Sequence, residues 1–235
     1  MKTCLAVPTI NELSNLKVLL PSLRQTFPDS TILIIDDGSS DGTRQFLDKL
    51  MASDRKMNAI YRHKKLGIGS AHLIALEYAS KNEFEYLLTL DGDLTHSPKD
   101  ALKLLIYVGE HDLVVGSRFV SAGGMSDWSI FRRILTRGAH FVTKIAFASE
   151  IDMSSALRIY KLSSVPLANL KASCGSSYDF FFQSILVYLE LGKKINQIPV
   201  ILESRGNGVS KMNLGLGLRN IFTLFLFAIK IKNIK

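Results

Sequence analysis

The sequence predicts an α/β fold in which helices cover both faces of a mainly parallel β-sheet. Over residues 1–118, short apolar segments alternate with longer segments whose apolar residues recur at helical spacing. Each apolar segment ends in polar residues or glycine, as strands do where they leave the core of such a sheet. The 235 residues are 47% hydrophobic and 21% charged, a composition typical of a globular chain with a substantial core.

The individual elements follow from local patterns. Buried strands are predicted over residues 4–7, 31–35, 58–62, 87–90 and 112–118. Asn11 and Glu12 open the first helix, whose leucines are spaced near helical periodicity. Three later helices are predicted: one contains Phe46, the next follows Gly67, and the third begins at Pro98. Right-handed crossovers place the carboxyl ends of all parallel strands along one edge of the sheet.

The most informative strand end is Asp91-Gly92-Asp93, which follows the apolar strand at 87–90. Residues i and i+2 of an extended chain point the same way, so both carboxylates can face one ion. Two hard oxygen ligands suit Mg²⁺ or Mn²⁺, whose shell is commonly completed by phosphate oxygens and water. The alternative interpretation is an acidic turn in which Asp93 caps the helix that begins at Pro98.

Polar residues at other strand ends favour the metal-binding interpretation. Asp37 follows another predicted strand and Arg118 ends a third, so they are expected at the same edge as Asp91 and Asp93. Three acids and an arginine at one edge suit a nucleotide diphosphate with a divalent cation. The net charge of +8 also favours an anionic partner. Clustered acids would repel a nucleic-acid backbone, so no nucleic-acid partner is expected.

Several motifs carry a resemblance to a known family. Three of them resemble inverting GT-A glycosyltransferases of family 2: Pro8-Thr9-x-Asn11-Glu12, Asp36-Asp37-Gly38-Ser39-x-Asp41-Gly42-Thr43 and Asp91-Gly92-Asp93. Others resemble the dolichyl- or polyprenyl-phosphate mannosyltransferase branch: Gly116-Ser117-Arg118-Phe119 with Gly123-Gly124, Trp128 and Arg132, then Asp152-x-x-Ser155-x-x-Arg158-x-Tyr160, Ile198-Pro199-Val200 and Arg205-x-x-Gly208-x-Ser210-Lys211. The resemblance implies a Rossmann-like GT-A catalytic domain over residues 1–212.

The same resemblance implies roles for individual residues. The nucleotide-sugar donor would be held by Pro8, Glu12, Asp37, Gly92, Arg205 and Lys211. The metal ligands would be Asp91, Asp93 and Thr95, and the catalytic set would be Asp93, Arg118 and Arg132. The arginines of this set would hold donor and acceptor phosphates. Thr95 stands where the branch has a glutamine ligand, which leaves the choice between Mg²⁺ and Mn²⁺ open.

The implied reaction moves a hexose from a nucleotide sugar to polyprenyl or dolichyl phosphate, with mannose and GDP-mannose favoured. A lipid phosphate is already anionic near neutral pH, so it can attack the anomeric carbon without a strong catalytic base. Metal and fixed cations would stabilise the leaving nucleoside diphosphate. The alternative is transfer to a sugar hydroxyl in surface polysaccharide or lipopolysaccharide assembly, with Asp152 or Asp179 as the base.

Two segments point to a membrane surface. Residues 128–148 and the C-terminal tail, 213–235, combine bulky apolar residues with lysine and arginine. This pattern predicts amphipathic helices that lie in the membrane interface; for 128–148 the alternative is a helix packed on the sheet. The tail is too short and too polar to span a bilayer. We therefore expect a peripheral enzyme on the cytoplasmic face of a membrane, with an integral-membrane subunit as a further candidate partner.

Overall fold

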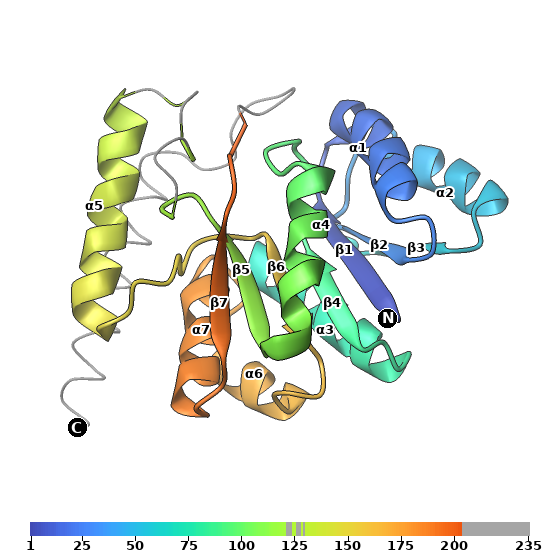
Figure 1. The fold of residues 1–235 in the computed structure, drawn as a ribbon. Coiled ribbons are helices and arrows are strands. Elements are labelled where there is room, and N and C mark those ends of the chain that lie inside the picture. Colours follow the sequence, from blue (N-terminus) through green and yellow to red (C-terminus); the bar gives the residue numbers. More distant parts are fainter. Residues whose placement is uncertain (121–123, 126–127, 129, 204–235) are drawn as a thin grey trace.

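The computed structural model describes residues 1–120, 124–125, 128 and 130–203. These residues build a seven-stranded sheet in the order β3-β2-β1-β4-β6-β5-β7, with helices packed around it (Figure 1). The strands are β1 (Thr3–Thr9), β2 (Thr31–Asp36), β3 (Met57–Tyr61), β4 (Tyr86–Thr89), β5 (Leu113–Ser117), β6 (Arg158–Lys161) and β7 (Ile195–Pro199). The helices are α1 (Leu13–Thr26), α2 (Thr43–Ser53), α3 (Ile68–Lys81), α4 (Pro98–Tyr107), α5 (Ile130–Phe147), α6 (Leu167–Ser173) and α7 (Asp179–Glu190), with the short 3-10 helix η1 (Val108–Glu110) after α4.

The sheet is parallel except at one strand. β1 pairs in parallel with β2 and β4, β2 with β3, and β5 with β7. β6 runs antiparallel between β4 and β5, so these two strands point the same way without being neighbours. The prediction of a mainly parallel sheet is confirmed, and the five predicted strands are displaced by at most two residues at either end. β6 and β7 were not among the predicted strands. The carboxyl ends of β1, β2, β4 and β5 share one edge.

Two hydrophobic cores lie on opposite faces of the sheet. Along β1, Leu5 and Val7 belong to the core shared with α1, α2 and α4. Cys4 and Ala6 belong to the core shared with α3, α6 and α7. Side chains of a strand alternate between the two faces, and both faces are buried, so β1 appears in the sequence as a continuous apolar run. The predicted covering of both faces by helices is confirmed.

Helix α5 stands apart from the sheet (Figure 1). It contacts the rest of the protein through His140, whose ring stacks on Phe119 with centroids 3.9 Å apart, and through Phe147. On its outer side Ile130, Ile134, Phe141 and Ile145 are between 58% and 69% exposed. Residues 130–147 of the predicted segment 128–148 therefore form a helix with one side against the protein and an apolar side in solvent, and its contact with a membrane stays a prediction.

The structure bears on membrane segments only within its described part. None of the helices in the described part of the chain has the length and apolar content needed to cross a bilayer. The predicted amphipathic tail, 213–235, lies outside the described residues.

His72 is a buried histidine inside the core between α3 and α7. Its ring stacks on Phe180 at 5.2 Å and meets Phe181 edge-on at 5.0 Å. Neither ring nitrogen has a hydrogen-bond partner among the described residues. Burial, assisted by the charge of Arg158, lowers the pKa of His72 from its ordinary 6.5 to about 3. The folded protein therefore keeps this ring neutral.

We expect His72 to make the fold less stable in mild acid. Its pKa is lower in the folded chain than in the unfolded chain, so between these values the unfolded chain binds a proton that the folded chain does not. The free energy of unfolding therefore falls with pH below about 6.5, by up to about 1.4 kcal/mol per pH unit. From about pH 7 to about pH 5.5, denaturant unfolding should show a loss about 1 kcal/mol larger in the wild type than in His72→Phe. The exposed His63 supplies the control, because His63→Phe should keep the wild-type slope; an equal slope in His72→Phe would contradict the expectation.

Candidate active site

The predicted polar groups lie along one edge of the sheet. Asp37 follows β2, Asp91 and Asp93 follow β4, and Arg118 follows β5. β1 separates β2 from β4, and β6 separates β4 from β5. Neighbouring strands are about 4.8 Å apart, so successive groups are roughly 10 Å apart along the edge. The site is therefore an extended row, suited to a long ligand, with the two aspartates in the middle.

At one end of the row, the loops that follow β1 and β2 are joined by hydrogen bonds. The backbone N–H of Asn11 donates to Ser39 Oγ at 2.7 Å, and that of Ser40 donates to Asn11 Oδ1 at 2.8 Å. The N–H of Leu13 donates to Asp41 Oδ2 at 2.9 Å. Two of the motifs that carry the family resemblance thus form a single structural unit.

Two predicted donor-binding residues lie at the start of this unit. Pro8 is buried near the end of β1, and Glu12 immediately precedes α1 with 7% of its surface exposed. The Glu12 carboxylate accepts a hydrogen bond from the Asn15 side chain at 2.6 Å. The structure places both residues at the expected edge, and their contact with a donor stays a prediction.

Asp37 is held by a buried arginine. Arg62 and Asp37 are 8% and 7% exposed, and the guanidinium Nη2 of Arg62 pairs with Asp37 Oδ1. The other carboxylate oxygen accepts the N–H of Leu66 at 3.3 Å, and Arg62 Nη1 donates to Ser70 Oγ at 2.6 Å. Arg62 was not predicted as a site residue; its signal is a basic residue directly after a strand that ends at the same edge.

Thr95 holds one oxygen of the Asp93 carboxylate. Its backbone N–H and its hydroxyl both donate to Asp93 Oδ1, at 3.1 and 2.6 Å. Gly92 is buried against the end of β1, where an added Cβ would lie 3.4 Å from the carbonyl oxygen of Pro8. Thr95 is thus a hydrogen-bond partner of Asp93, and its role as a metal ligand stays a prediction.

The buried His96 supports the backbone of Asp91. The N–H of Asp91 donates to His96 Nδ1 at 3.2 Å, and the same nitrogen lies 3.7 Å from Asp91 Oδ2. Burial lowers the pKa of His96 to about 4, although the charge of Asp93 opposes this shift. A neutral ring that accepts a backbone N–H fixes the loop without adding a charge. His96 was not predicted from the sequence, where a histidine soon after an acidic motif is its only signal.

The two aspartates fit a hydrated divalent cation. The side chain of Asp91 is 35% exposed, so its oxygens are accessible to a ligand. Among the described residues, no group of three or more His, Cys, Asp and Glu side chains could hold a metal ion. Two carboxylates without a complete protein cage are a donor set that Mg²⁺ or Mn²⁺ takes when phosphate oxygens and water fill its shell. The pair therefore suits a cation that binds together with a diphosphate.

Arg118 is a largely buried cation paired with Asp152. The Arg118 side chain is 11% exposed, and its Nε donates at 3.1 Å to Oδ2 of Asp152, which is fully buried. Phe119 and Trp128 flank the guanidinium, with ring centroids 5.3 and 5.7 Å from its central carbon. Burial alone would raise the pKa of Asp152, but Arg118 and Ser154 outweigh it and hold this pKa below its ordinary value. A buried, paired carboxylate of lowered pKa is a poor base, which weighs against the role considered for Asp152 with a hydroxyl acceptor.

Three other residues were predicted as cations of the site, and the structure describes only the backbone of the first of them. Arg132 lies in the first turn of α5, and its side chain is outside the described part. Arg205 and Lys211 lie outside the described residues. The described chain ends at Glu203, whose N–H donates to the carbonyl of Thr95 at 3.2 Å. The last described residue therefore contacts the loop that carries Asp93.

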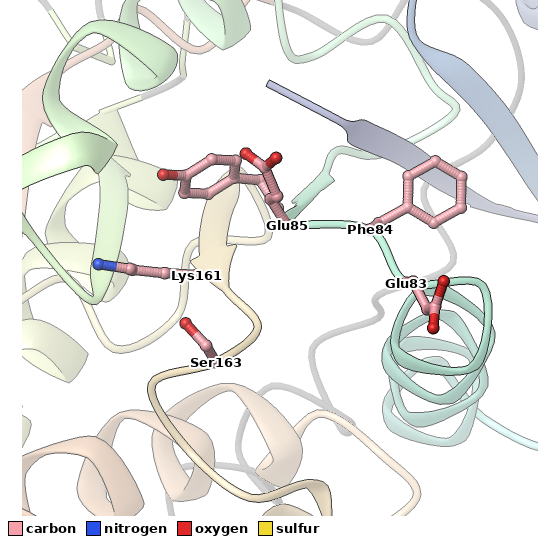
Figure 2. Close-up of a pocket in the computed structure, with 6 residues that line it drawn as sticks. Glu83, Phe84, Glu85, Lys161 and Ser163 are labelled. Carbon is pink, nitrogen blue, oxygen red and sulfur yellow. The ribbon is translucent and has the colours of Figure 1, made fainter.

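A separate hollow of about 390 Å³ lies away from this edge (Figure 2). It is lined by Glu83, Phe84, Glu85, Tyr86, Lys161 and Ser163. Figure 2 shows Lys161 and Ser163 on one segment and Glu83, Phe84 and Glu85 along another. Tyr86 begins β4 and Lys161 ends the antiparallel β6, so the hollow is at the opposite edge of the sheet. It has no part in the row of polar groups.

Comparison with known proteins agrees with this arrangement. Residues 4–164 match the protein family described as Glycosyl transferase family 2. The chain therefore belongs to glycosyltransferase family 2.

Two relatives are similar over most of the chain. Undecaprenyl-phosphate mannosyltransferase of Micrococcus luteus is 30% identical over 217 residues, which cover 92% of this chain and 89% of the relative. Polyprenol monophosphomannose synthase of Mycolicibacterium smegmatis is 28% identical over 215 residues, which cover 90% of this chain and 81% of the relative.

Solved structures support the fold. Glucosyl-3-phosphoglycerate synthase from Mycobacterium tuberculosis, in complex with Mn²⁺, UDP and glucosyl-3-phosphoglycerate, aligns with a TM-score of 0.68 at 16% identity. The alignment covers 97% of this chain and 79% of that one. At this identity the likeness concerns the fold alone, and it confirms the predicted GT-A architecture.

Proposed function

We propose that this protein is an inverting glycosyltransferase that moves a hexose, with mannose favoured, from a nucleotide sugar to polyprenyl phosphate. The observation that carries the proposal is the row of groups at the sheet edge. Asp37 stands at one end, the Asp91 and Asp93 pair in the middle and Arg118 at the other end. A nucleoside, a diphosphate and an acceptor phosphate would meet these groups in this order. The two relatives named for polyprenyl-phosphate mannosylation support the choice of acceptor.

The residues divide the chemistry between them. Pro8, Glu12 and Asp37 bind the nucleoside, and Arg118, Arg132, Arg205 and Lys211 bind phosphates. A divalent cation held by Asp91 and Asp93, with Thr95 beside it, would offset the charge of the leaving diphosphate. The acceptor phosphate carries its own negative charge, so the transfer needs cations that bring two anions together more than it needs a base. The lack of an accessible base at Asp152 agrees with such an acceptor.

The donor and the metal are part of the same proposal. We infer GDP-mannose as the donor and Mg²⁺ or Mn²⁺ as the cation, and we place the catalytic domain within residues 1–212. The test is a screen of nucleotide sugars with a short polyprenyl phosphate, read as lipid-linked product by mass spectrometry in Mg²⁺ and in Mn²⁺. Product with GDP-mannose and none with a sugar hydroxyl acceptor is the expected result. Transfer only to sugar hydroxyls would replace this proposal with the polysaccharide alternative.

We also propose a peripheral location on the cytoplasmic face of a membrane, because polyprenyl phosphate keeps its chain in the bilayer. The outward side of α5 supports this location, since Ile134, Phe141 and Ile145 are exposed there. Arg137 and Lys144 lie on the same helix and carry the charge that anionic lipid attracts. The tail at 213–235 adds a second surface segment, and an integral-membrane subunit is a candidate partner.

Phe141→Ser should weaken vesicle binding. Losing one aromatic side chain from the lipid interface removes about 2 kcal/mol of favourable free energy from apolar burial, and this lowers the partition coefficient into the vesicles roughly tenfold or more. Co-sedimentation with vesicles that contain anionic lipid should show this loss, and salt should weaken binding of both proteins. Val18→Ser is the matched control, since Val18 is 59% exposed on α1. A truncated chain that ends at Asn213 measures how much the tail contributes to vesicle affinity. If neither the full-length protein nor the truncated chain binds vesicles at low salt, the membrane proposal is wrong.

A further inference from the structure

Asp152 accepts two hydrogen bonds from one edge of the Arg118 guanidinium. Its Oδ2 accepts from Nε at 3.1 Å and its Oδ1 accepts from Nη2 at 3.3 Å. Nη2 also donates to the hydroxyl of Ser154, which in turn donates to Asp152 Oδ1 at 2.9 Å. Within the part of the chain that the structure describes, no acceptor is found for Nη1 of Arg118. The described contacts therefore hold the guanidinium through Nε and Nη2, and none of them uses Nη1.

The loop that carries Asp152 is itself fixed from two sides. Gln197 on β7 accepts the N–H of Asp152 through Oε1 at 2.7 Å and donates through Nε2 to the carbonyl of Glu150 at 3.1 Å. Arg158 on β6, which is fully buried, donates through Nη2 to the carbonyl of Met153 at 3.1 Å. Both flanks of Asp152 are thus tied to the sheet, so its carboxylate has a set position.

We propose that Asp152 is a positioning residue that aligns Arg118 for the phosphate of the acceptor. This inference rests on the proposed function. A free arginine at a surface would lose side-chain freedom each time it bound a phosphate, whereas a guanidinium already held by a carboxylate has lost that freedom in advance. Phe119 and Trp128 lie close to the same guanidinium, and their ring contacts favour this alignment.

The first test is Asp152→Asn. The amide keeps the volume of the side chain but replaces one acceptor oxygen with a donor and removes the charge, so it cannot accept from both guanidinium nitrogens. We expect the KM for a short polyprenyl phosphate to rise roughly 10- to 100-fold, while the KM for the nucleotide sugar stays near the wild-type value. Asp112→Asn is the matched control. Its carboxylate accepts from Ser164 Oγ at 2.6 Å and from the N–H of Lys194 at 2.8 Å, at the other end of β5.

The second test is chemical rescue in Arg118→Ala. This variant leaves the buried Asp152 carboxylate without its cation, so its melting temperature should fall. Millimolar guanidinium ion should refill the space, raise the melting temperature and restore use of the polyprenyl phosphate. In the double variant Arg118→Ala with Asp152→Asn, the same ion should restore neither property. Rescue that does not depend on Asp152 would overturn the proposal.

The outcomes separate this inference from the function on which it rests. A wild-type protein that uses no polyprenyl phosphate overturns both. An active wild type whose Asp152→Asn variant keeps its acceptor KM within about twofold overturns the positioning role alone. Equal increases in the donor and the acceptor KM, with a lowered melting temperature, would show that Asp152 serves only the fold.

Discussion

Asp93→Asn should abolish transfer and weaken metal-dependent donor binding. Asp93 lies in the loop after β4 in the middle of the row, and its Oδ1 is oriented by two hydrogen bonds from Thr95. The amide keeps the shape but removes the negative charge that a divalent cation needs. Losing one charged ligand should cost about 4 kcal/mol of leaving-group stabilisation, which is roughly a thousandfold in rate. The measurements are kcat with saturating Mn²⁺ and calorimetric binding of the nucleotide sugar with and without Mn²⁺.

Asp54→Asn controls for the loss of a carboxylate as such. Asp54 pairs with Arg24 at 2.8 Å in the loop that precedes β3, at the opposite edge of the sheet. Its partly exposed ion pair should be worth less than about 1 kcal/mol, and activity should be unchanged. Near-normal turnover of Asp93→Asn at saturating Mn²⁺ would remove Asp93 from the metal site.

Gly69→Ala should destabilise the protein severely. Gly69 lies in the first turn of α3, where an added Cβ would be 2.5 Å from the carbonyl oxygens of Gly175 and Ser177 and 2.7 Å from the Cβ of Phe180. Two of these neighbours are backbone atoms, so the loop before α7 would have to move as a whole. We expect a loss of about 3 kcal/mol in the free energy of unfolding, at the upper end of the usual cost of overpacking.

Gly138→Ala gives the matched comparison in another helix. Gly138 lies within α5, and an added Cβ there would meet no atom within 4 Å. Alanine is the better helix former, so this variant should gain up to about 1 kcal/mol. Denaturant unfolding of both variants measures the contrast, and similar values for the two would contradict the packing that places Gly69 against the loop.

The sequence alone predicts the strands and the site residues in the half of the molecule where the strands are parallel. β1, β2 and β4 are buried on both faces, so they appear as apolar runs, and the polar residues after them lie at the predicted edge. For this reason Asp37, Asp91 and Asp93 could be placed before the structure was known. Their partners could not, because the pairing of Asp37 with Arg62 depends on how two loops meet rather than on spacing within either one.

Asp152 shows why the remainder of the site was harder to predict. β6 runs against its neighbours, so the loop that precedes it lies at the catalytic edge, while the loop that follows it lies at the other. Asp152 precedes a strand, so the rule that site residues follow strands does not place it, although it belongs to a motif that carries the family resemblance. Its contact with Arg118 spans 34 positions in the sequence, and periodicity carries no information about such a pair.

Loops 10–12 and 37–42 can be exchanged between relatives only as a pair. The hydrogen bonds of Asn11 with Ser39 and Ser40 cross from one loop to the other, and the first residue of α1, Leu13, is bonded to Asp41 of the second loop. A chimera that imports one loop to change the preferred nucleoside would lose these exposed hydrogen bonds, each worth about 0.5–1.5 kcal/mol. The sequences of these two segments should therefore co-vary in evolution. A redesign of donor preference should replace both loops together.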